Sequence, residues 1–407
     1  MDGIDIRVAK IIDYWIGVPV CFILTLLHRV HKFLAGAGKL SGYAPRRIMF
    51  LKLSEIGGTI LTYPAFVAIK KKYPQAELYF WIFRENKEAL SILGIVPEEN
   101  IFTIRGKSIS LMLWDTLKTV LLVRKERIDI LIDAELFPRF SSILSYLSGA
   151  KFRAGFYKYT LEGLYRGDFY THRVTYNPYL HISNNFSALV DSLCAMPDDV
   201  PLVKAPSLRE EEFRLPNVLI GIGERERMLD RLKSINNRVN LSTKIILMNI
   251  GFHDKIPIRR WTLEYYIKLV NLLMKAKDII VVIVGIGDTG DENPFSKYEN
   301  CIDLLGKTTI RELLSLFNIS QAIISHDSGI IHLASLSNIY IIALYGPETP
   351  ILYGPLKDNK KVFYKKFMCS PCLSAYNHRS SICKDNKCMR AITVDEVYAA
   401  VKEHIQM

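Results

Sequence analysis

The chain has 407 residues, more than one α/β core usually holds, which favours two domains. Hydrophobic residues make up 49% of it and charged residues 23%, a globular composition that excludes a disordered chain. The net charge of +12 favours anionic partners such as nucleotide phosphates or lipid headgroups. No nucleic-acid-binding motif accompanies the charge, so we expect no nucleic-acid partner.

The first 45 residues contain one apolar run, 14–27, followed by basic residues. A helix that crosses a bilayer needs about 20 apolar residues, and Pro19 disfavours an unbroken helix. Basic residues such as Arg29 and Lys32 after such a run are typical of a helix at a membrane surface. We therefore predict that residues 1–45 form a helical membrane-surface segment. The alternative is a helix packed on the body of the protein.

Short apolar runs alternate with helical patterns between residues 46 and 207. The run 47–53 predicts a strand, followed by a glycine turn and a helix, 59–72, in which Pro64 marks a kink or a late start. Repeated units of this kind predict a parallel sheet covered by helices. Further strands are predicted at 78–83, 101–104 and 128–132, and further helices at 85–93 and 111–124.

A second series of strands and helices occupies residues 244–407, after a charged, pattern-poor stretch, 208–243, that we predict to be a linker. The sequence therefore predicts an α/β protein with two doubly wound, Rossmann-like domains, 46–207 and 244–407, that face each other across a cleft. Ligands of such sheets bind at the carboxyl ends of the strands. The second series has predicted strands at 244–249, 278–284, 300–304, 322–325 and 339–344, and predicted helices at 263–275, 310–317 and 329–336.

The segment from Gly285 to Gly290 matches the dinucleotide-binding pattern G-x-G-x-x-G and follows a predicted strand. That pattern needs a helix to begin at the glycines, and Pro294 with its polar neighbours argues against one. A nicotinamide-dependent oxidoreductase is therefore an alternative only. A contact from this loop to a sugar nucleotide fits the residues better.

A polar cluster, His326-Asp327-Ser328-Gly329 with His332, follows the predicted strand 322–325. Asp327 could simply cap the next helix. However, free amides at a helix start and the small Gly329 suit a bound phosphate, and a cap does not require two histidines. We therefore predict ligand binding at this strand end.

Four segments occur in one order along the chain: Leu51-Lys52-Leu53-Ser54-x-Ile56-Gly57, Arg259-Arg260-Trp261, Asp327-Ser328-Gly329-x-x-His332-Leu333-Ala334 and Tyr345-Gly346-Pro347. Together they resemble the ADP-heptose:lipopolysaccharide heptosyltransferases, glycosyltransferase family 9. The resemblance begins near residue 46, extends to the C-terminus and implies the GT-B fold. It also implies an inverting, metal-independent transfer of heptose or a similar sugar from a nucleotide sugar to a lipopolysaccharide-core or other surface glycolipid.

The resemblance places the donor, ADP-heptose or a similar nucleotide sugar, on the C-terminal domain and the acceptor on the N-terminal domain. Arg259 aligns with the family's phosphate-binding basic residue, and an arginine can bond two phosphate oxygens at once. A packed helix histidine is the alternative for His332. The other expected donor-binding residues are Asp288, Asp327, Ser328, Gly329 and His332, and the expected phosphate turn is Gly57, Gly58 and Thr59.

The chain departs from the family at the expected catalytic base. The family usually has Gly-Asp in the first turn, and this chain has Gly57-Gly58, so Gly58 cannot take a proton. Glu55 lies three residues earlier, and we expect it to be the substitute base. Asp133 and Glu135 are alternatives, as is an inactive protein that binds sugar nucleotides or acts as a scaffold in glycan assembly.

Four cysteines near the C-terminus, Cys369, Cys372, Cys383 and Cys388, follow the spacing C-x2-C-x10-C-x4-C. Four thiolates could hold a structural zinc ion, with free thiols or disulfides as the alternative. A closed four-cysteine site has no open position, so we expect catalysis to need no cofactor. The sequence favours a cytoplasmic enzyme, peripheral on the inner face of the cell membrane, whose partners are a nucleotide sugar and a lipid-linked glycan.

Overall fold

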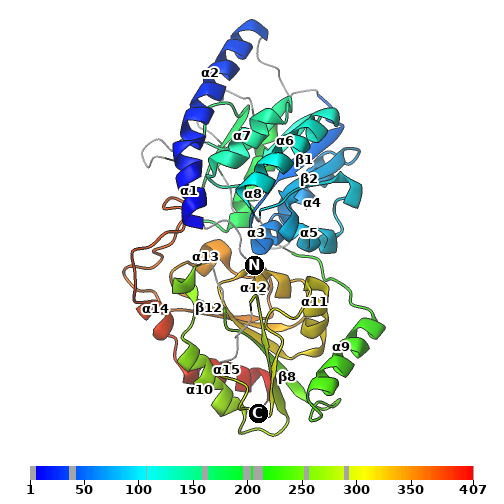
Figure 1. The fold of residues 1–407 in the computed structure, drawn as a ribbon, viewed down its shortest axis with the longest axis vertical. Helices are drawn as coiled ribbons and strands as arrows, with labels where there is room; N and C mark the ends of the chain where they lie inside the picture. The colour runs from blue at the N-terminus through cyan, green and yellow to red at the C-terminus, as the bar shows by residue number, and fades with distance from the viewer. Residues whose placement is uncertain are drawn as a thin grey trace. The chain divides into compact units, whose positions relative to one another are not determined.

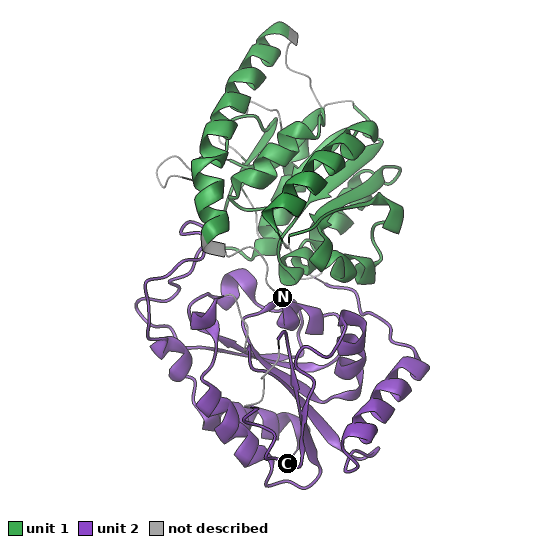
Figure 2. Cartoon of the chain, viewed as in Figure 1, with its two compact units in different colours: residues 1–213 green, residues 214–407 purple. Residues whose placement is uncertain are grey.

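The computed structural model describes residues 6–35, 43–106, 108–157, 164–195, 203–204, 214–251, 256–287 and 293–406. The chain divides into two compact units, residues 1–213 and 214–407, which Figure 2 colours separately. The range 208–243, predicted to be a linker, includes a helix, α9 (Ile222–Ile235), that packs on α11 (Ile310–Ile319) inside unit 2.

Unit 1 is built on a seven-stranded parallel sheet in the order β3-β2-β1-β4-β5-β6-β7. Strand β1 (Arg47–Leu51) pairs with β2 (Glu77–Phe83) on one side and β4 (Ile130–Asp133) on the other. Strand β4 is buried along its whole length, as expected for a parallel strand with helices on both faces. The other strands are β3 (Ile101–Ile104), β5 (Phe152–Phe156), β6 (His172–Thr175) and β7 (Val203–Lys204).

The helix after β1 is divided in two, because Pro64 lies in the first turn of the second part. This is the late start that the sequence allowed. Val123 and Leu144, from α6 and α7, pack in one cluster with Met49 of β1, so these two helices cover the same face of the sheet. The helices of unit 1 after β1 are α3 (Ile56–Leu61), α4 (Tyr63–Lys72), α5 (Lys87–Leu93), α6 (Ile109–Lys125), α7 (Arg139–Leu147) and α8 (Ile182–Asp191).

Two N-terminal helices, α1 (Ile6–Trp15) and α2 (Gly17–Ala35), precede the sheet, and α2 packs on α7 (Figure 1). The Asp13 carboxylate accepts hydrogen bonds from the backbone N–H groups of Arg139 and Phe140, both at 2.9 Å. These are among the first amides of α7, which no side chain of its own N-cap residue satisfies. Asp13 therefore caps a helix that lies far from it in the sequence.

The stretch Val8–Leu34 is long and apolar enough to cross a membrane, judged by length and composition alone. This corrects the expectation that Pro19 breaks the helix, because Pro19 lies in the first turn of α2, where proline is tolerated. One face of the stretch is packed on unit 1, which matches the alternative raised from the sequence. The other face is apolar and exposed, with the side chains of Ile11, Trp15, Phe22, Leu26, Leu27, Val30 and Phe33.

Unit 2 contains a six-stranded parallel sheet in the order β10-β9-β8-β11-β12-β13. Its strands are β8 (Lys244–Asn249), β9 (Ile279–Val284), β10 (Cys301–Asp303), β11 (Ala322–His326), β12 (Tyr340–Tyr345) and β13 (Lys360–Tyr364). Besides α9 and α11 its helices are α10 (Leu263–Leu273), α12 (Gly329–Ala334), α13 (Pro350–Tyr353), α14 (Lys387–Arg390) and α15 (Val394–Ile405). The two parallel sheets confirm the predicted pair of doubly wound domains.

Candidate functional site

The carboxyl ends of β8 and β11 meet in unit 2, because the two strands are parallel neighbours with Ser325 in register with Asn249. The Asn249 side-chain amide donates to the hydroxyl oxygens of Ser325 and Ser328, at 2.9 Å each. Asn249 was predicted as a strand residue and not as a site residue. Its position at the end of an apolar run was the available signal.

Arg259 and Asp327 are brought together although 68 residues separate them. Arg259 lies in a short 3-10 turn, Pro257–Arg259, between β8 and α10. Its Nη1 is 3.4 Å from Oδ2 of Asp327, and the two side chains are only 14% and 7% exposed. A largely desolvated ion pair of this kind keeps the guanidinium beside the Asp327 carboxylate through this one contact.

The two histidines of the polar segment are both buried, His326 completely and His332 to 5% exposure. A side chain at Gly251, whose φ is +61°, would overlap the His326 ring, so this turn requires glycine. His332 lies within α12, which begins at Gly329 after Ser328. Since α12 has only six residues, the site depends on its side chains more than on a helix dipole.

A second ion pair near Asp327 was not predicted from the sequence. Glu348 is 2% exposed and its Oε1 lies 3.1 Å from Nε of Arg379. Burial raises the pKa of Tyr345 well above its usual value, and the negative charges of Asp327 and Glu348 raise it further. Glu348 directly follows the Tyr345-Gly346-Pro347 segment, which was the signal available in the sequence.

In unit 1 the turn between β1 and α3 carries the predicted base, Glu55. This residue is exposed, and its backbone has φ 67° and ψ 117°, a conformation that residues with a side chain rarely adopt. Its side chain forms no capping bond to α3. Thr59 donates from its backbone N–H and its hydroxyl to the Glu55 carbonyl, at 3.0 and 3.2 Å, and so fixes the turn.

Gly57 is buried at the start of α3, and Gly58 lies against a lysine. A Cβ atom at Gly58 would be 2.9 Å from Cε of Lys52. The Lys52 ammonium is itself held by Glu135, at 3.0 Å, and by the Ser54 carbonyl, at 3.0 Å. The space where the family's aspartate would begin is therefore occupied by the lysine stem.

The two alternative carboxylates, Asp133 and Glu135, are buried and fully engaged. Glu135 accepts from the backbone N–H groups of Leu53 and Ser54, both at 2.8 Å, besides its ion pair with Lys52. Asp133 pairs with the fully buried Arg166 and accepts from the Tyr170 hydroxyl at 2.6 Å. Both carboxylates are thus buried and hydrogen-bonded within the fold, whereas Glu55 is exposed in the turn.

The predicted zinc site is not supported by the geometry. Among the residues that the structure describes, no three His, Cys, Asp or Glu side chains are arranged to hold a metal ion. Cys388 is buried, whereas Cys369 and Cys383 are exposed and Cys372 is partly exposed. Burial raises the pKa of the Cys388 thiol to about 11, and the nearby Cys372, Cys369 and Cys383 add to the rise. Asp288, predicted to contact the donor, lies outside the described residues.

Comparison with known proteins identifies the relatives of this chain. The model of glycosyltransferase family 9 (heptosyltransferase) matches residues 122–382. A lipooligosaccharide heptosyltransferase 2 of Haemophilus influenzae is 32% identical over 112 residues, which cover 26% of this chain and 32% of that protein. The chain thus spans between about a third and a half of the length of the first curated relatives it matches. The lipopolysaccharide core heptosyltransferase OpsX of H. influenzae is 22% identical over 320 residues, 77% of this chain and 83% of that protein.

Solved structures agree with these relatives on the fold. The Escherichia coli ADP-heptose lipopolysaccharide heptosyltransferase II superposes with a TM-score of 0.64 at 18% identity, over 88% of this chain and 98% of that one. A family 9 glycosyltransferase from Veillonella parvula gives 0.66 at 19% identity, over 89% and 97%. These structures confirm the predicted GT-B fold class. Because the family model covers more than half of the chain, the protein belongs to glycosyltransferase family 9, the heptosyltransferases.

Proposed function

We propose that the protein is a glycosyltransferase that moves heptose, or a similar sugar, from a nucleotide sugar to a lipopolysaccharide-core or other surface glycolipid. The observation that carries this proposal is the group of Asn249, Arg259, Asp327 and Ser328 at the carboxyl ends of β8 and β11. The names of its relatives, lipopolysaccharide and lipooligosaccharide heptosyltransferases, supply the donor and acceptor classes.

In this proposal Arg259 binds the donor diphosphate. As the bond between the sugar and the diphosphate breaks, negative charge grows on the leaving oxygen, and a prepositioned guanidinium stabilises it. Asp327 holds that guanidinium in place, and Ser328, itself held by Asn249, offers a hydroxyl to the donor. His332 supports the helix from inside, since it is buried.

Glu55 takes the proton of the acceptor hydroxyl, whose oxygen then forms the new bond to the anomeric carbon. A single displacement of this kind inverts the configuration at that carbon, and no metal is needed where cationic side chains carry the charge. The enzyme works at the inner face of the cell membrane, where lipid-linked glycans are found.

The test is nucleotide release by the purified full chain, given a panel of nucleotide sugars and extracted glycolipid. We expect release of ADP from ADP-heptose that depends on the glycolipid, with inverted anomeric configuration in the product. Tight donor binding without turnover on any member of the panel would contradict a transferase. A product of retained configuration would contradict the single displacement only.

A further inference from the structure

Helix α6 carries a stripe of large apolar side chains on its outer face. Leu113, Trp114, Leu117 and Leu121 are between 55% and 67% exposed. The leucines recur every fourth residue, so they lie one above the other on one side of the helix. The opposite side packs in the core of unit 1 through the fully buried Val123. Contiguous exposed apolar side chains of this kind mark a contact surface.

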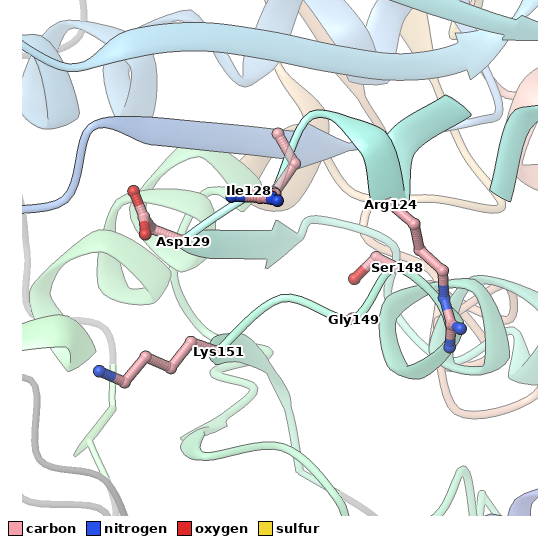
Figure 3. A pocket seen from close by; sticks show the side chains of 7 residues that line it. Arg124, Ile128, Asp129, Ser148, Gly149 and Lys151 are labelled. Atoms are coloured by element: carbon pink, nitrogen blue, oxygen red, sulfur yellow. The ribbon is translucent and has the colours of Figure 1, made fainter. Parts of the chain in front are cut away.

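A shallow basic cavity of about 530 Å³, largely open to solvent, lies at the C-terminal end of α6 (Figure 3). Its lining includes three cationic side chains, Arg124, Arg127 and Lys151. The Asp129 carboxylate in the lining already accepts from the backbone N–H groups of Arg46 and Arg47, at 2.8 and 3.0 Å. The lining holds three cations against this one carboxylate, a net positive charge that suits an anion such as a phosphate group.

Helix α7 lies between α6, which carries the stripe, and the N-terminal helix α2. Helix α2 packs on α7, and the His28 ring meets Tyr146 edge-on with centroids 6.1 Å apart. On the other flank, Arg124 of α6 donates to the carbonyl of Leu147, the last residue of α7, at 2.7 Å. The C-terminal parts of α2 and α6 thus lie beside the same end of α7 (Figure 1).

We propose that the outer face of α6, together with the basic cavity, is a lipid-docking surface that binds an anionic bilayer. The stripe enters the boundary between headgroups and acyl chains, and the cavity holds a lipid phosphate. An apolar face bordered by cations is the pattern of interfacial helices. The proposal rests on the proposed function only in that the acceptor there is lipid-linked.

The first test measures binding of the full chain to vesicles of phosphatidylcholine, with and without about a third of phosphatidylglycerol. The variant Leu117→Glu/Leu121→Glu changes two exposed residues, so it leaves the core intact. We expect it to bind the anionic vesicles at least tenfold more weakly. The matched control is Leu241→Glu/Ile382→Glu, which adds the same charge at positions of unit 2 that are 90% and 100% exposed. Equal affinities of variant and control would overturn the proposal.

The second test removes the charge of the cavity in the variant Arg124→Gln/Arg127→Gln/Lys151→Gln. We expect about fivefold weaker binding to anionic vesicles for each cation removed, and no change on neutral vesicles. The control Lys277→Gln/Lys361→Gln/Lys366→Gln removes equal charge from exposed positions of unit 2. A loss of the same size in the control would mean that net charge alone attracts the protein, which also overturns a defined site.

The same variants separate this proposal from the proposed function. With glycolipid dispersed in detergent, we expect both α6 and cavity variants to turn over at the wild-type rate. A protein that binds anionic vesicles through α6 but releases no nucleotide would refute the transferase and keep the docking surface. If the protein is active but neither the α6 variant nor the cavity variant changes its vesicle binding, the docking surface is refuted and the transferase is kept.

Discussion

In both units polar residues lie at the carboxyl ends of parallel strands. The two units differ in the contacts that hold those residues in place. In unit 2 the candidate side chains hold one another, through the Arg259–Asp327 pair and the bonds of Asn249. In unit 1 the buried carboxylates are used by the fold, and Glu55 is held by its main chain in a conformation with φ 67°. Such a conformation costs about 1–3 kcal/mol and persists where the surroundings enforce it.

This difference means that the two units should respond differently to substitution. Removing one side chain of the cluster in unit 2 leaves its partner without that contact. Such a change should therefore lower the affinity for the donor and also disturb the positions of the remaining site residues. Removing the Glu55 side chain relieves strain, so stability and activity should move in opposite directions. The following predictions are ordered by the size of the expected effect.

Glu55 should give the largest effect on turnover. We expect Glu55→Gln to lower turnover by about 10²–10⁴-fold, because the amide cannot accept the proton, and to leave stability unchanged. Glu55→Gly should lose turnover equally and raise the free energy of unfolding by about 1 kcal/mol, because glycine tolerates the positive φ. Nucleotide release and urea unfolding measure the two quantities. Wild-type turnover in Glu55→Gln would eliminate Glu55 as the base.

Arg259 should give the next largest effect, and it should appear in donor binding as well. We expect Arg259→Ala to lower turnover by about 10²–10³-fold, since the charge on the leaving diphosphate loses its cation. Arg259→Lys should recover only part of this, because lysine cannot bond two oxygens in a fixed plane. Calorimetric titration with ADP gives the affinity. Arg260→Ala is the matched control, and an equal loss in that variant would contradict a specific role.

Asp13 tests whether the N-terminal helices stabilise the rest of unit 1. Arg139 is buried and its Nη1 lies 3.3 Å from Asp13, so Asp13→Ala removes both a cap and an ion-pair partner. We expect the free energy of unfolding to fall by about 3 kcal/mol. Asp13→Asn keeps an oxygen for the α7 amides and should lose less. An unchanged unfolding curve for Asp13→Ala would show that the helices are not coupled to the unit.

Acid should weaken unit 1 gradually through the buried His172. Burial, with a smaller contribution from the charge of Lys72, lowers the pKa of His172 from an ordinary value of 6.5 to about 4. The unfolded chain therefore binds more protons between pH 6.5 and 4. The contribution of neutral His172 to the free energy of unfolding is fully present above pH 6.5. It falls by about 1 kcal/mol per pH unit as the pH drops to 4. Urea unfolding at several pH values should show a flatter slope for His172→Gln; an unaltered slope would mean that other groups bind the proton.

The fold was predictable because its strands are short apolar runs separated by regular helical patterns. The predicted strands 101–104 and 244–249 coincide with β3 and β8. The helix α9 was not predicted, because most of its residues are polar and few are buried. The continuation of α2 through Pro19 was also missed, since the position of a helix start decides whether proline breaks it.

The site residues were predictable in part. Contacts between residues far apart in the sequence were not predictable. Asp327 and Arg259 were each recognised from their local segments, but their contact spans 68 residues and no local pattern encodes it. The engagement of Glu135 by the Leu53 and Ser54 amides was hidden for the same reason, which left it a rival to Glu55. The cysteine spacing suggested a zinc site. Cys369, Cys372 and Cys383 do lie near enough to Cys388 to raise its pKa, but among the described residues no three such side chains are arranged to hold a metal ion.

The cap that Asp13 places on α7 has a consequence for the order of synthesis. Arg139 follows Asp13 by 126 residues, so roughly ten seconds of translation pass before α7 exists. During that interval the apolar stretch Val8–Leu34 has left the ribosome without the surface on which its inner face will pack. Any other apolar surface that the nascent helix meets first competes with α7 for binding to it. Unit 1 is complete only when the helix has packed on α7.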